Sequence, residues 1–310
     1  MSHTLSRVAT TSPSGADTWR VDGYHPEGDV YARLIEKDSE VENIANVIVS
    51  QDVGGRYHCC GDDDLPLDYS RVEGKAIGNH KHYRLVLDVV GRPLVEFGST
   101  HELVKCMLDA LQGHVEHRDI SVGSLIIVAE EGITRGLLID WELSRYESDK
   151  GARTYERTGT WQFMSARLSS ATKPQARELA DDLESFLLVM LWLAVLYAPG
   201  TMHPKTRADR IKIFDDANPE LKSLVMSGGK SWVAKLASPH FGRLLMKLLD
   251  GFAARYHEPL RLDPSPPPST VYLESHAWMM EKLREALEDE TWRVLKDAGE
   301  LQPIQKPEVF

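Results

Sequence analysis

The chain contains only three cysteines among its 310 residues, Cys59, Cys60 and Cys106. An odd, low count with one adjacent pair provides no disulfide framework. Cysteine usage of this kind is typical of proteins that stay in a reducing compartment. The count therefore excludes a disulfide-stapled secreted module.

Long hydrophobic runs are also missing. The longest, residues 186–198, has thirteen residues, whereas about 20 are needed to cross a bilayer. It predicts a buried core helix instead. Residues 1–15 are rich in Ser and Thr, lack the apolar centre of a secretory signal, and are predicted to be disordered. These absences predict a cytoplasmic or nuclear protein without a membrane partner.

An excess of basic charge is the third absence. The chain has 36 Lys and Arg against 47 Asp and Glu, a formal net charge of -11. No block of basic residues reverses the sign locally. Proteins that bind nucleic acid or acidic membranes through general electrostatics usually present a basic surface. The charge balance therefore predicts no nucleic-acid partner.

Hydrophobic periodicity changes character near Ser99. Before it, short runs of apolar and β-branched residues predict strands, with one helical pattern between them; after it, helical spacing dominates. The predicted strands are 17–20, 47–49 and 83–90, with a helix at 29–35. One later helix is predicted to start at Ser99 or Thr100, and three more are predicted at 176–197, 239–255 and 273–298. A strand-rich first part and a helix-rich second part predict an α+β fold with two lobes.

The chemistry-bearing stretch is His117-Arg118-Asp119, which stands between a helical run and the β-type run 125–128. A second acid, Asp140, ends the next apolar run twenty-one residues after Asp119. Two strands joined by a turn would bring both carboxylates to one site. Protein kinases use this arrangement for a catalytic Asp and a Mg²⁺-binding Asp. Alone, Asp119 could equally cap a turn, as Asp often does.

Six motifs in order extend this pattern along the chain. They are Glu27-Gly28-Asp29-Val30-Tyr31, Tyr83-Arg84-Leu85-Val86-Leu87 with Val90-Gly91-Arg92-Pro93-Leu94, His117-Arg118-Asp119-Ile120-Ser121-Val122-Gly123, Leu138-Ile139-Asp140-Trp141-Glu142-Leu143, Arg157-Thr158-Gly159-Thr160-Trp161-Gln162-Phe163-Met164-Ser165, and Asp181-Asp182-Leu183-Glu184-Ser185-Phe186. With them the sequence resembles the fungal-type protein kinase family over about residues 16–260.

The resemblance implies a protein kinase-like, two-lobe fold with a reduced β-rich N-lobe and a helical C-lobe. It implies four regions: a disordered 1–15, a partial N-lobe over 16–90, a C-lobe over 91–263, and a Pro-rich linker with a C-terminal helix over 264–310. It also implies Mg-ATP as cofactor and a protein substrate or binding partner of unknown identity. The polar segment 143–165 is predicted to be mobile.

Site residues are carried over by position. Asp119 resembles the catalytic Asp, with His117 as a packed orienting residue and Arg118 as a candidate partner for a phosphate on the segment containing Thr154, Tyr155, Thr158 and Thr160. Asp140 and Ser124 resemble the two Mg²⁺ ligands. Glu27 resembles the helix Glu that pairs with the phosphate-binding Lys, and Val89, Val90 and Gly91 resemble the hinge that contacts adenine. Asp182 resembles the buried Asp that anchors the catalytic loop.

Three departures from the family pattern bear on activity. Ala16 stands where the phosphate-binding Lys is expected, no Gly-rich loop precedes it, and Ser124 replaces the Asn that binds the second Mg²⁺. The N-lobe is therefore predicted to be truncated by two or three strands. Positioning and electrostatic stabilisation provide most of the catalysis in kinases, so these losses predict a large loss of rate.

Three functions stay open from the sequence. The first is a protein kinase that transfers phosphate from ATP to Ser or Thr hydroxyls, with impaired activity. The second is a pseudokinase that acts as a binding or scaffold module. The third, less favoured, is a small-molecule phosphotransferase of the same fold; Arg118 and Thr158-Gly159-Thr160 argue against it because such enzymes usually lack the activation segment.

Overall fold

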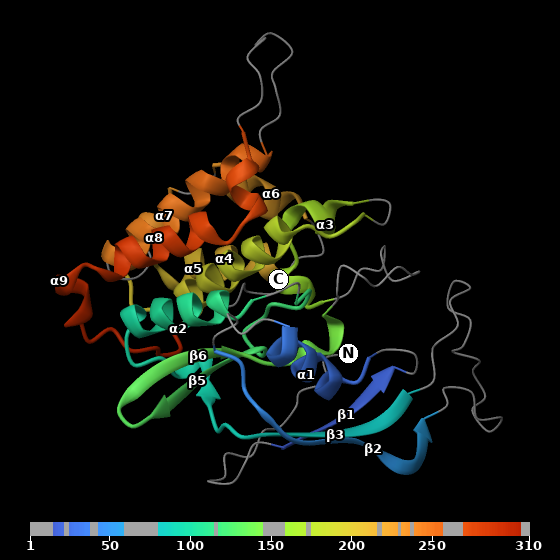
Figure 1. The fold of residues 1–310 in the computed structure, drawn as a ribbon. Helices are drawn as coiled ribbons and strands as arrows, with labels where there is room; N and C mark the ends of the chain where they lie inside the picture. The colour runs from blue at the N-terminus through green and yellow to red at the C-terminus, as the bar shows by residue number, and fades with distance from the viewer. Residues whose placement is uncertain are drawn as a thin grey trace.

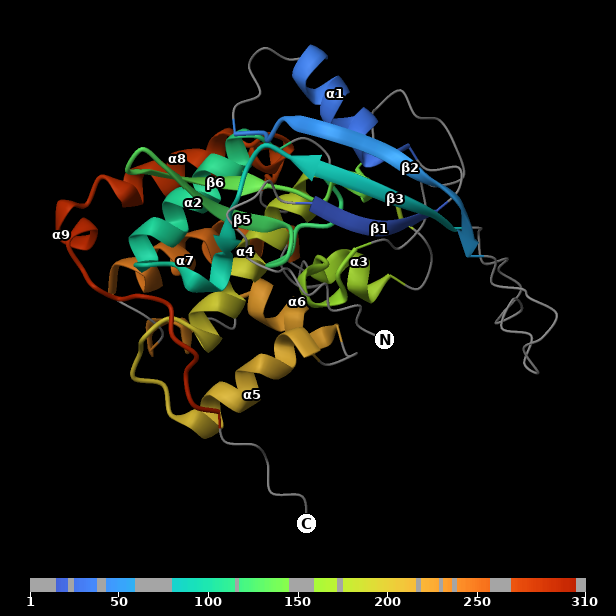
Figure 2. The same ribbon diagram turned by 90° about the horizontal axis from the view of Figure 1, so that it is seen from below.

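The first lobe is a small antiparallel sheet with one helix. In the computed structural model, β1 (Gly15–Val21), β2 (Val47–His58) and β3 (His80–Leu87) pair in the order β1-β3-β2. Helix α1 (Glu27–Lys37) lies over one face of this sheet (Figure 2). Its buried residues Val30, Tyr31 and Leu34 follow helical spacing, so one face of α1 is directed into the core.

Not every segment of the chain is described. The structure describes residues 15–21, 25–37, 43–58, 80–114, 117–144, 159–171, 175–215, 219–228, 231–235, 239–256 and 269–304. The predicted disordered start, most of the predicted mobile segment and the Pro-rich linker lie outside these residues, as do Cys59 and Cys60.

A second small sheet lies against helix α2 (Thr100–Gln112). It contains β4 (Arg92–Pro93), β5 (Leu125–Glu130) and β6 (Ile133–Leu138), all antiparallel. Helix α2 crosses β6 so closely that a Cβ on Gly136 would overlap the backbone of Cys106. Glycine is therefore required at this crossing. The Gly136 N–H donates to the Asp109 carboxylate of α2 (3.1 Å).

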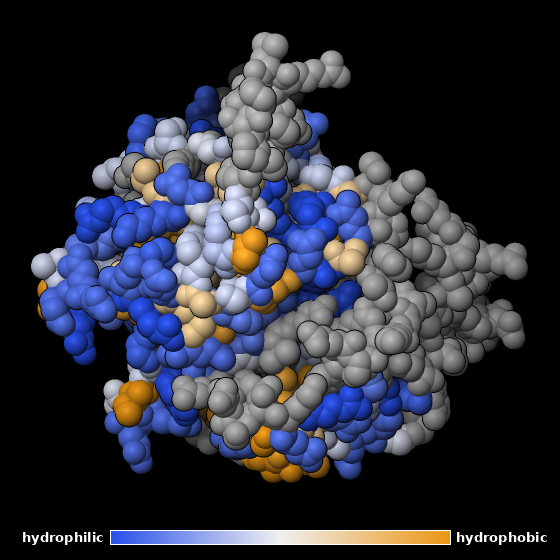
Figure 3. Space-filling view, turned by 45° about the horizontal axis from the view of Figure 1, so that its top comes forward, coloured by the Kyte–Doolittle hydropathy of each residue, from blue (hydrophilic) through white to orange (hydrophobic). Residues whose placement is uncertain are grey.

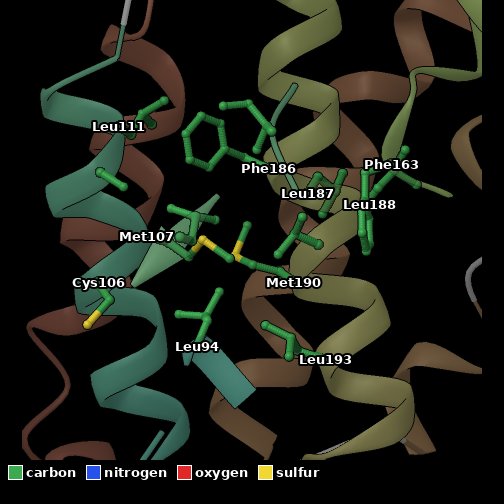
Figure 4. Packing of buried hydrophobic residues seen from close by; sticks show 14 of the residues in the cluster. Leu94, Cys106, Met107, Leu111, Phe163, Phe186, Leu187, Leu188, Met190 and Leu193 are labelled. Atoms are coloured by element: carbon green, nitrogen blue, oxygen red, sulfur yellow. The ribbon is translucent and has the colours of Figure 1, made fainter. Parts of the chain in front are cut away.

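The helical lobe is built around α4 (Leu179–Leu196), which is buried on nearly every side. Figure 4 shows side chains of α2 and α4 directed toward each other, with Met107 and Met190 meeting between the two helices. A helix that is apolar all round is expected only at the centre of a domain. The predicted α+β architecture with two lobes is confirmed, and Figure 1 shows the helical lobe above the sheet lobe.

The remaining elements complete the fold, and several of them pack against α4. They are η2 (Leu94–Glu96), η3 (Trp141–Leu143), η5 (Trp161–Phe163), α3 (Ala166–Ser170), α5 (Pro204–Asp215), α6 (Glu220–Met226), η6 (Val233–Lys235), α7 (Pro239–Ala253), η7 (Ala254–Tyr256), η8 (Val271–Glu274), α8 (Ala277–Leu287) and α9 (Glu290–Arg293). No helix in the described residues is both long enough and apolar enough to cross a membrane. The face in Figure 3 is largely hydrophilic, with small hydrophobic patches.

The C-terminal segment, residues 269–304, differs from the expected single charged helix over 273–298. It forms η8, α8 and α9, and the helix is interrupted because Asp289 has an extended backbone and caps α9 by accepting the Thr291 N–H (3.0 Å). The segment also has a buried side. Leu273, Leu283 and Trp292 belong to the same hydrophobic core as α4. The prediction of one continuous helix was therefore wrong.

The C-terminal segment closes on the start of α2. The Asp297 carboxylate accepts hydrogen bonds from the backbone N–H (2.9 Å) and the hydroxyl of Thr100, which is fully buried. The Trp292 indole N–H donates to the same hydroxyl (2.8 Å). Beyond them, the Gly299 N–H donates to the Phe97 carbonyl (2.8 Å). These contacts make the segment part of the helical lobe.

We expect Trp292→Ala to reduce the free energy of unfolding by about 3–5 kcal/mol, because it deletes a fully buried indole and leaves a cavity. Chemical denaturation measures this loss. The control is Val294→Ala, at a side chain two residues away that is 75% exposed. An exposed substitution of this kind should change stability by no more than about 0.5 kcal/mol. Equal effects of the two substitutions would mean that the segment is not part of the folded core.

Candidate functional site

The central loop, residues 117–124, is held by a single carboxylate of α4. One oxygen of Asp182, Oδ2, accepts the backbone N–H groups of His117 (3.1 Å) and Arg118 (3.0 Å) and the His114 ring N–H (3.0 Å). The other oxygen accepts from Arg177 (2.8 Å). Burial alone would raise the pKa of Asp182, but Arg177 and His114 together hold that pKa far below its usual range.

His117 connects the central loop to the strand that leads to Asp140. Its Nε2 lies 3.0 Å from the Ile139 carbonyl and donates to it, while its Nδ1 accepts the Asp119 N–H (3.3 Å). Burial lowers the pKa of His117 to about 3, so the ring is neutral in the neutral range. The ring also packs against Trp141, with centroids 4.7 Å apart. Both ring nitrogens are engaged, which suits orientation rather than proton transfer.

Asp119 is positioned from the far side by Thr160. Its Oδ1 accepts both the Thr160 backbone N–H (2.6 Å) and the Thr160 hydroxyl (2.8 Å). Gly159 makes this approach possible: its φ is +111°, and a Cβ there would lie 2.7 Å from the Arg118 carbonyl. Asp119 is half-buried, and no described group bonds its second oxygen.

Arg118 has a left-handed backbone, with φ +71°, and its side chain is buried. The backbone turn points its N–H at Asp182. Of its candidate phosphate partners, Thr154, Tyr155 and Thr158 lie outside the described residues. The Thr160 hydroxyl is bonded to Asp119. Docking of a phosphate by Arg118 therefore stays a prediction.

Asp140 lies beside the central loop because β5 and β6 form a tight hairpin. The Ile139 N–H donates to the Ser124 carbonyl (2.9 Å), which continues the ladder past the ends of the strands. Asp140 itself has a left-handed backbone, with φ +70°, and is exposed. An exposed carboxylate at this position is a suitable oxygen ligand for Mg²⁺. The described residues contain no ready-made group of three or more His, Cys, Asp or Glu side chains that could hold a metal.

Ser124 is directed into the loop. Its hydroxyl donates to the carbonyl of Asp119 (3.0 Å) or Ser121 (3.1 Å) and accepts the Ser121 N–H (2.8 Å). The side chain is 1% exposed. Its single hydroxyl hydrogen and its lone pairs thus serve the turn, and the side chain is too short to reach outward as Asn does. This geometry fits a structural role better than the predicted metal ligation.

Glu27 begins α1 and reaches the segment after Asp140. Its carboxylate accepts the Trp141 backbone N–H (3.0 Å) and is 6% exposed. Within the described residues, no Lys or Arg lies within ion-pair distance of it. Burial first, and then the negative charge of Asp140, raise the pKa of Glu27 to about 8.

The predicted nucleotide-binding residues lie on the sheet lobe and the connection below it. Ala16 pairs with Leu85 across β1 and β3, at the position predicted for the missing Lys. Of the predicted hinge, Val89 is buried and Val90 is 46% exposed. A Cβ on Gly91 would overlap Ile126 of β5. The hinge therefore runs against the β4-β5-β6 sheet.

Sequence reasoning missed Lys222, a buried ammonium under the segment that follows Thr160. Its Nζ donates to the carbonyls of Trp161 (2.6 Å) and Met164 (3.2 Å), the two ends of η5. It also lies 5.3 Å from the centre of the Trp161 ring. Burial lowers the pKa of Lys222 to about 8. No spacing rule identifies a Lys that acts from α6, at a sequence separation of 61 residues from Trp161.

A second missed group holds the end of the same segment. Arg255, after α7, contacts Glu178 (2.8 Å), Asp181 (2.9 Å) and Glu184 (3.3 Å) at the start of α4. Glu184 in turn accepts the Ala166 N–H (2.7 Å). These charge-assisted bonds connect α3 to the helix that carries Asp182. The acidic first turn of α4 was predicted, but its basic partner was not.

Comparison with known proteins agrees with this geometry. A family model described as fungal protein kinase matches residues 35–194, slightly more than half of the chain. The match contains the central loop, Asp140, Thr160 and Asp182. No curated protein matches the chain.

We expect Glu27→Gln to change how stability depends on pH. The folded-state pKa of Glu27 is about 8, against an ordinary value of 4.5, so the folded chain retains a proton between these values that the unfolded chain has released. The stabilising contribution of that proton is fully present below pH 4.5 and is lost as pH rises through 8. The loss amounts to at most about 1.4 kcal/mol per pH unit.

Gln is always neutral, and its amide oxygen can accept the Trp141 N–H. The variant should therefore lose less stability across this range and exceed the unmodified protein at pH 8 and above. Urea denaturation at a series of pH values measures it, with the exposed Glu36→Gln on the same helix as control. If the free energy of unfolding changed with pH in the same way in Glu27→Gln and in the unmodified protein, the raised pKa of Glu27 would be contradicted.

Proposed function

The chain belongs to the fungal protein kinase family, and we propose that it is a kinase-like domain that transfers phosphate from Mg-ATP to protein Ser or Thr hydroxyls at a reduced rate. The fold and family support the kinase-like domain. The reduced activity is inferred from the individual side chains at the site.

The position of Asp119 carries the proposal. One of its oxygens is bonded to Thr160 by two hydrogen bonds, so the carboxylate has a defined orientation. The second oxygen is available to accept a hydrogen bond from an acceptor hydroxyl and to take its proton late in the transfer. His117 and Asp182 hold the backbone of the same loop. The base is thus preorganised before any substrate binds.

Asp140 is the residue that would bind Mg²⁺, because its carboxylate is exposed beside the central loop. A bound Mg²⁺ supplies neutralisation of charge on the transferring phosphate. Of the two predicted ligands only Asp140 fits, since the Ser124 hydroxyl is engaged within the loop. A site with one anchored metal ligand in place of two supports binding better than rapid turnover.

Glu27 supports the reduced rate. In the family the corresponding Glu pairs with the Lys that holds the nucleotide phosphates, and Ala16 is the residue predicted at the position of that Lys. The described residues provide no cation to replace this Lys beside Glu27. Glu27 keeps its bond to the Trp141 N–H. The contact between α1 and the segment after Asp140 therefore does not need the positive charge of a phosphate-binding Lys.

Lys222 supports a protein acceptor. It fixes both ends of η5, the turn between Thr160 and α3 that faces the central loop. A rigid surface next to Asp119 is suited to an extended peptide carrying the acceptor hydroxyl. A small-molecule acceptor needs no such surface.

A pseudokinase is the second candidate. It is favoured by the inward-facing Ser124 hydroxyl and by the Glu27 carboxyl, which has no cation beside it among the described residues. In this role the domain binds a partner, or nucleotide without transfer. Two measurements distinguish the candidates: whether nucleotide binds, and whether phosphate transfer then depends on Asp119.

Addition of Mg-ATP should raise the melting temperature of the full chain. Ligand at about 100 times its Kd stabilises the folded state by about 2.7 kcal/mol. Asp140→Asn should reduce the shift, whereas Glu290→Gln, an exposed acid on α9, should leave it unchanged. The absence of any shift at millimolar Mg-ATP would reject phosphoryl transfer and favour the pseudokinase.

If nucleotide binds, Asp119→Asn should lower phosphate transfer to Ser/Thr peptides by at least about 100-fold, because the proton acceptor is removed. Transfer of labelled γ-phosphate measures this, with Glu290→Gln again as control. Small alcohols serve as alternative acceptors and should receive no phosphate. Transfer that survives Asp119→Asn would exclude Asp119 as the base.

A further inference from the structure

His276 of the C-terminal segment touches the anchor of the central loop. Its Nε2 lies 2.8 Å from Nδ1 of His114, whose other nitrogen, Nε2, lies 3.0 Å from Oδ2 of Asp182. That same oxygen accepts the backbone N–H groups of His117 and Arg118. A residue 162 positions from His114 in sequence therefore ends a hydrogen-bonded chain that leads to the loop.

The direction of the hydrogen bonds follows from the acceptor at the end. The ionised Asp182 carboxylate can only accept, so Nε2 of His114 must carry the proton that lies between them. In the tautomer with its one proton on Nε2, His114 has a lone pair on Nδ1. This lone pair accepts the Nε2–H of His276, because the two nitrogens are only 2.8 Å apart. His276 therefore fixes both the tautomer and the ring orientation of His114.

The rest of the C-terminal segment holds His276 in place. Residue 276 precedes α8, whose Met279 and Leu283 are fully buried in the common core. Helix α8 lies against α2, and α2 ends at Gln112, just before His114 (Figure 1). His114 is packed edge-on against Phe186 of α4 as well, with ring centroids 5.5 Å apart.

We infer that His276 is a positioning residue through which the C-terminal segment holds the central loop, by way of His114 and Asp182. Through this contact the C-terminal segment helps to keep the central loop, which carries Asp119, in one conformation. The inference concerns the geometry of the loop and stands whether or not phosphate is transferred.

Hydrogen exchange at the His117 and Arg118 amides tests this inference. In His276→Ala the Nδ1 of His114 loses its donor, so the ring can turn and weaken its bond to Asp182. We expect these two amides to exchange about 3- to 10-fold faster, the effect of one hydrogen bond, relative to amides in the middle of α7 that report global unfolding. NMR-detected exchange at one pH measures the ratio.

His240→Ala is the matched control. Its Nδ1 lies 2.8 Å from Asp289 and its ring stacks on Trp292, so it also connects the C-terminal segment to the helical lobe. None of its described contacts reaches the central loop, so its loss should leave the ratio unchanged. His276→Gln, which retains an N–H donor near the position of Nε2, should restore most of the protection.

The ring nitrogens provide a second readout. Loss of the His276 donor should shift the ¹⁵N resonance of His114 Nδ1 toward that of a free lone pair, while Nε2 keeps its proton. Equal exchange ratios in His276→Ala and His240→Ala, an unchanged ratio in His276→Ala, or no ¹⁵N shift would overturn the inference. Because none of these measurements uses nucleotide, a failure of the proposed enzymatic function leaves the test intact.

Discussion

The position of the central loop depends on one buried carboxylate, that of Asp182. A lone charge in a protein interior is strongly unfavourable, so Asp182 is tolerated only because five donor groups surround it. Two of these are the backbone N–H groups of His117 and Arg118. An attachment through backbone atoms does not depend on which side chains the loop carries.

Glu27 illustrates the opposite electrostatic outcome for an equally buried acid. Asp182 has Arg177 within 2.8 Å, whereas Glu27 faces the charges of Asp140 and Glu142. Burial disfavours the charged form in both cases, but the neighbouring charge has the opposite sign, and Asp182 also accepts more hydrogen bonds. The pKa of Asp182 is therefore lowered and the pKa of Glu27 is raised. A neutral Glu27 still accepts the Trp141 N–H, so the interlobe contact does not require a Lys.

Local pattern predicted much of this architecture. The spacing of the apolar residues indicated α1 and α7, and the unbroken apolar run indicated α4. Of the two caps expected for α2, Ser99 and Thr100, Ser99 is the one that caps it, with its hydroxyl 3.0 Å from the Glu102 N–H. The order of the acids predicted that Asp119 and Asp140 flank one hairpin. These features depend on neighbours in sequence, which is why a single sequence contains them.

Contacts between distant residues could not be predicted in this way. Lys222, Arg255 and His276 act on the site from α6 and from segments after α7, and nothing in their local spacing marks them. The break in the expected C-terminal helix likewise depends on the tertiary position of Trp292, which is buried against α2 and α7. The alternating acidic and basic residues of the C-terminal segment indicated only its exposed side and not its buried side.

The position predicted for the phosphate-binding Lys and the groups that hold Asp119 belong to different lobes. Ala16, at the position predicted for that Lys, is on the sheet lobe, and the donors that bond Asp119 and its loop are on the helical lobe. Thr160 and Asp182 contact the central loop directly, and His276 reaches it through His114. None of these residues belongs to the sheet lobe. A change at the predicted Lys position therefore need not alter the contacts that hold Asp119. The preserved geometry of Asp119 is accordingly an argument for the fold and for binding, and a weaker one for rate, since rate requires both lobes to act on the same phosphate.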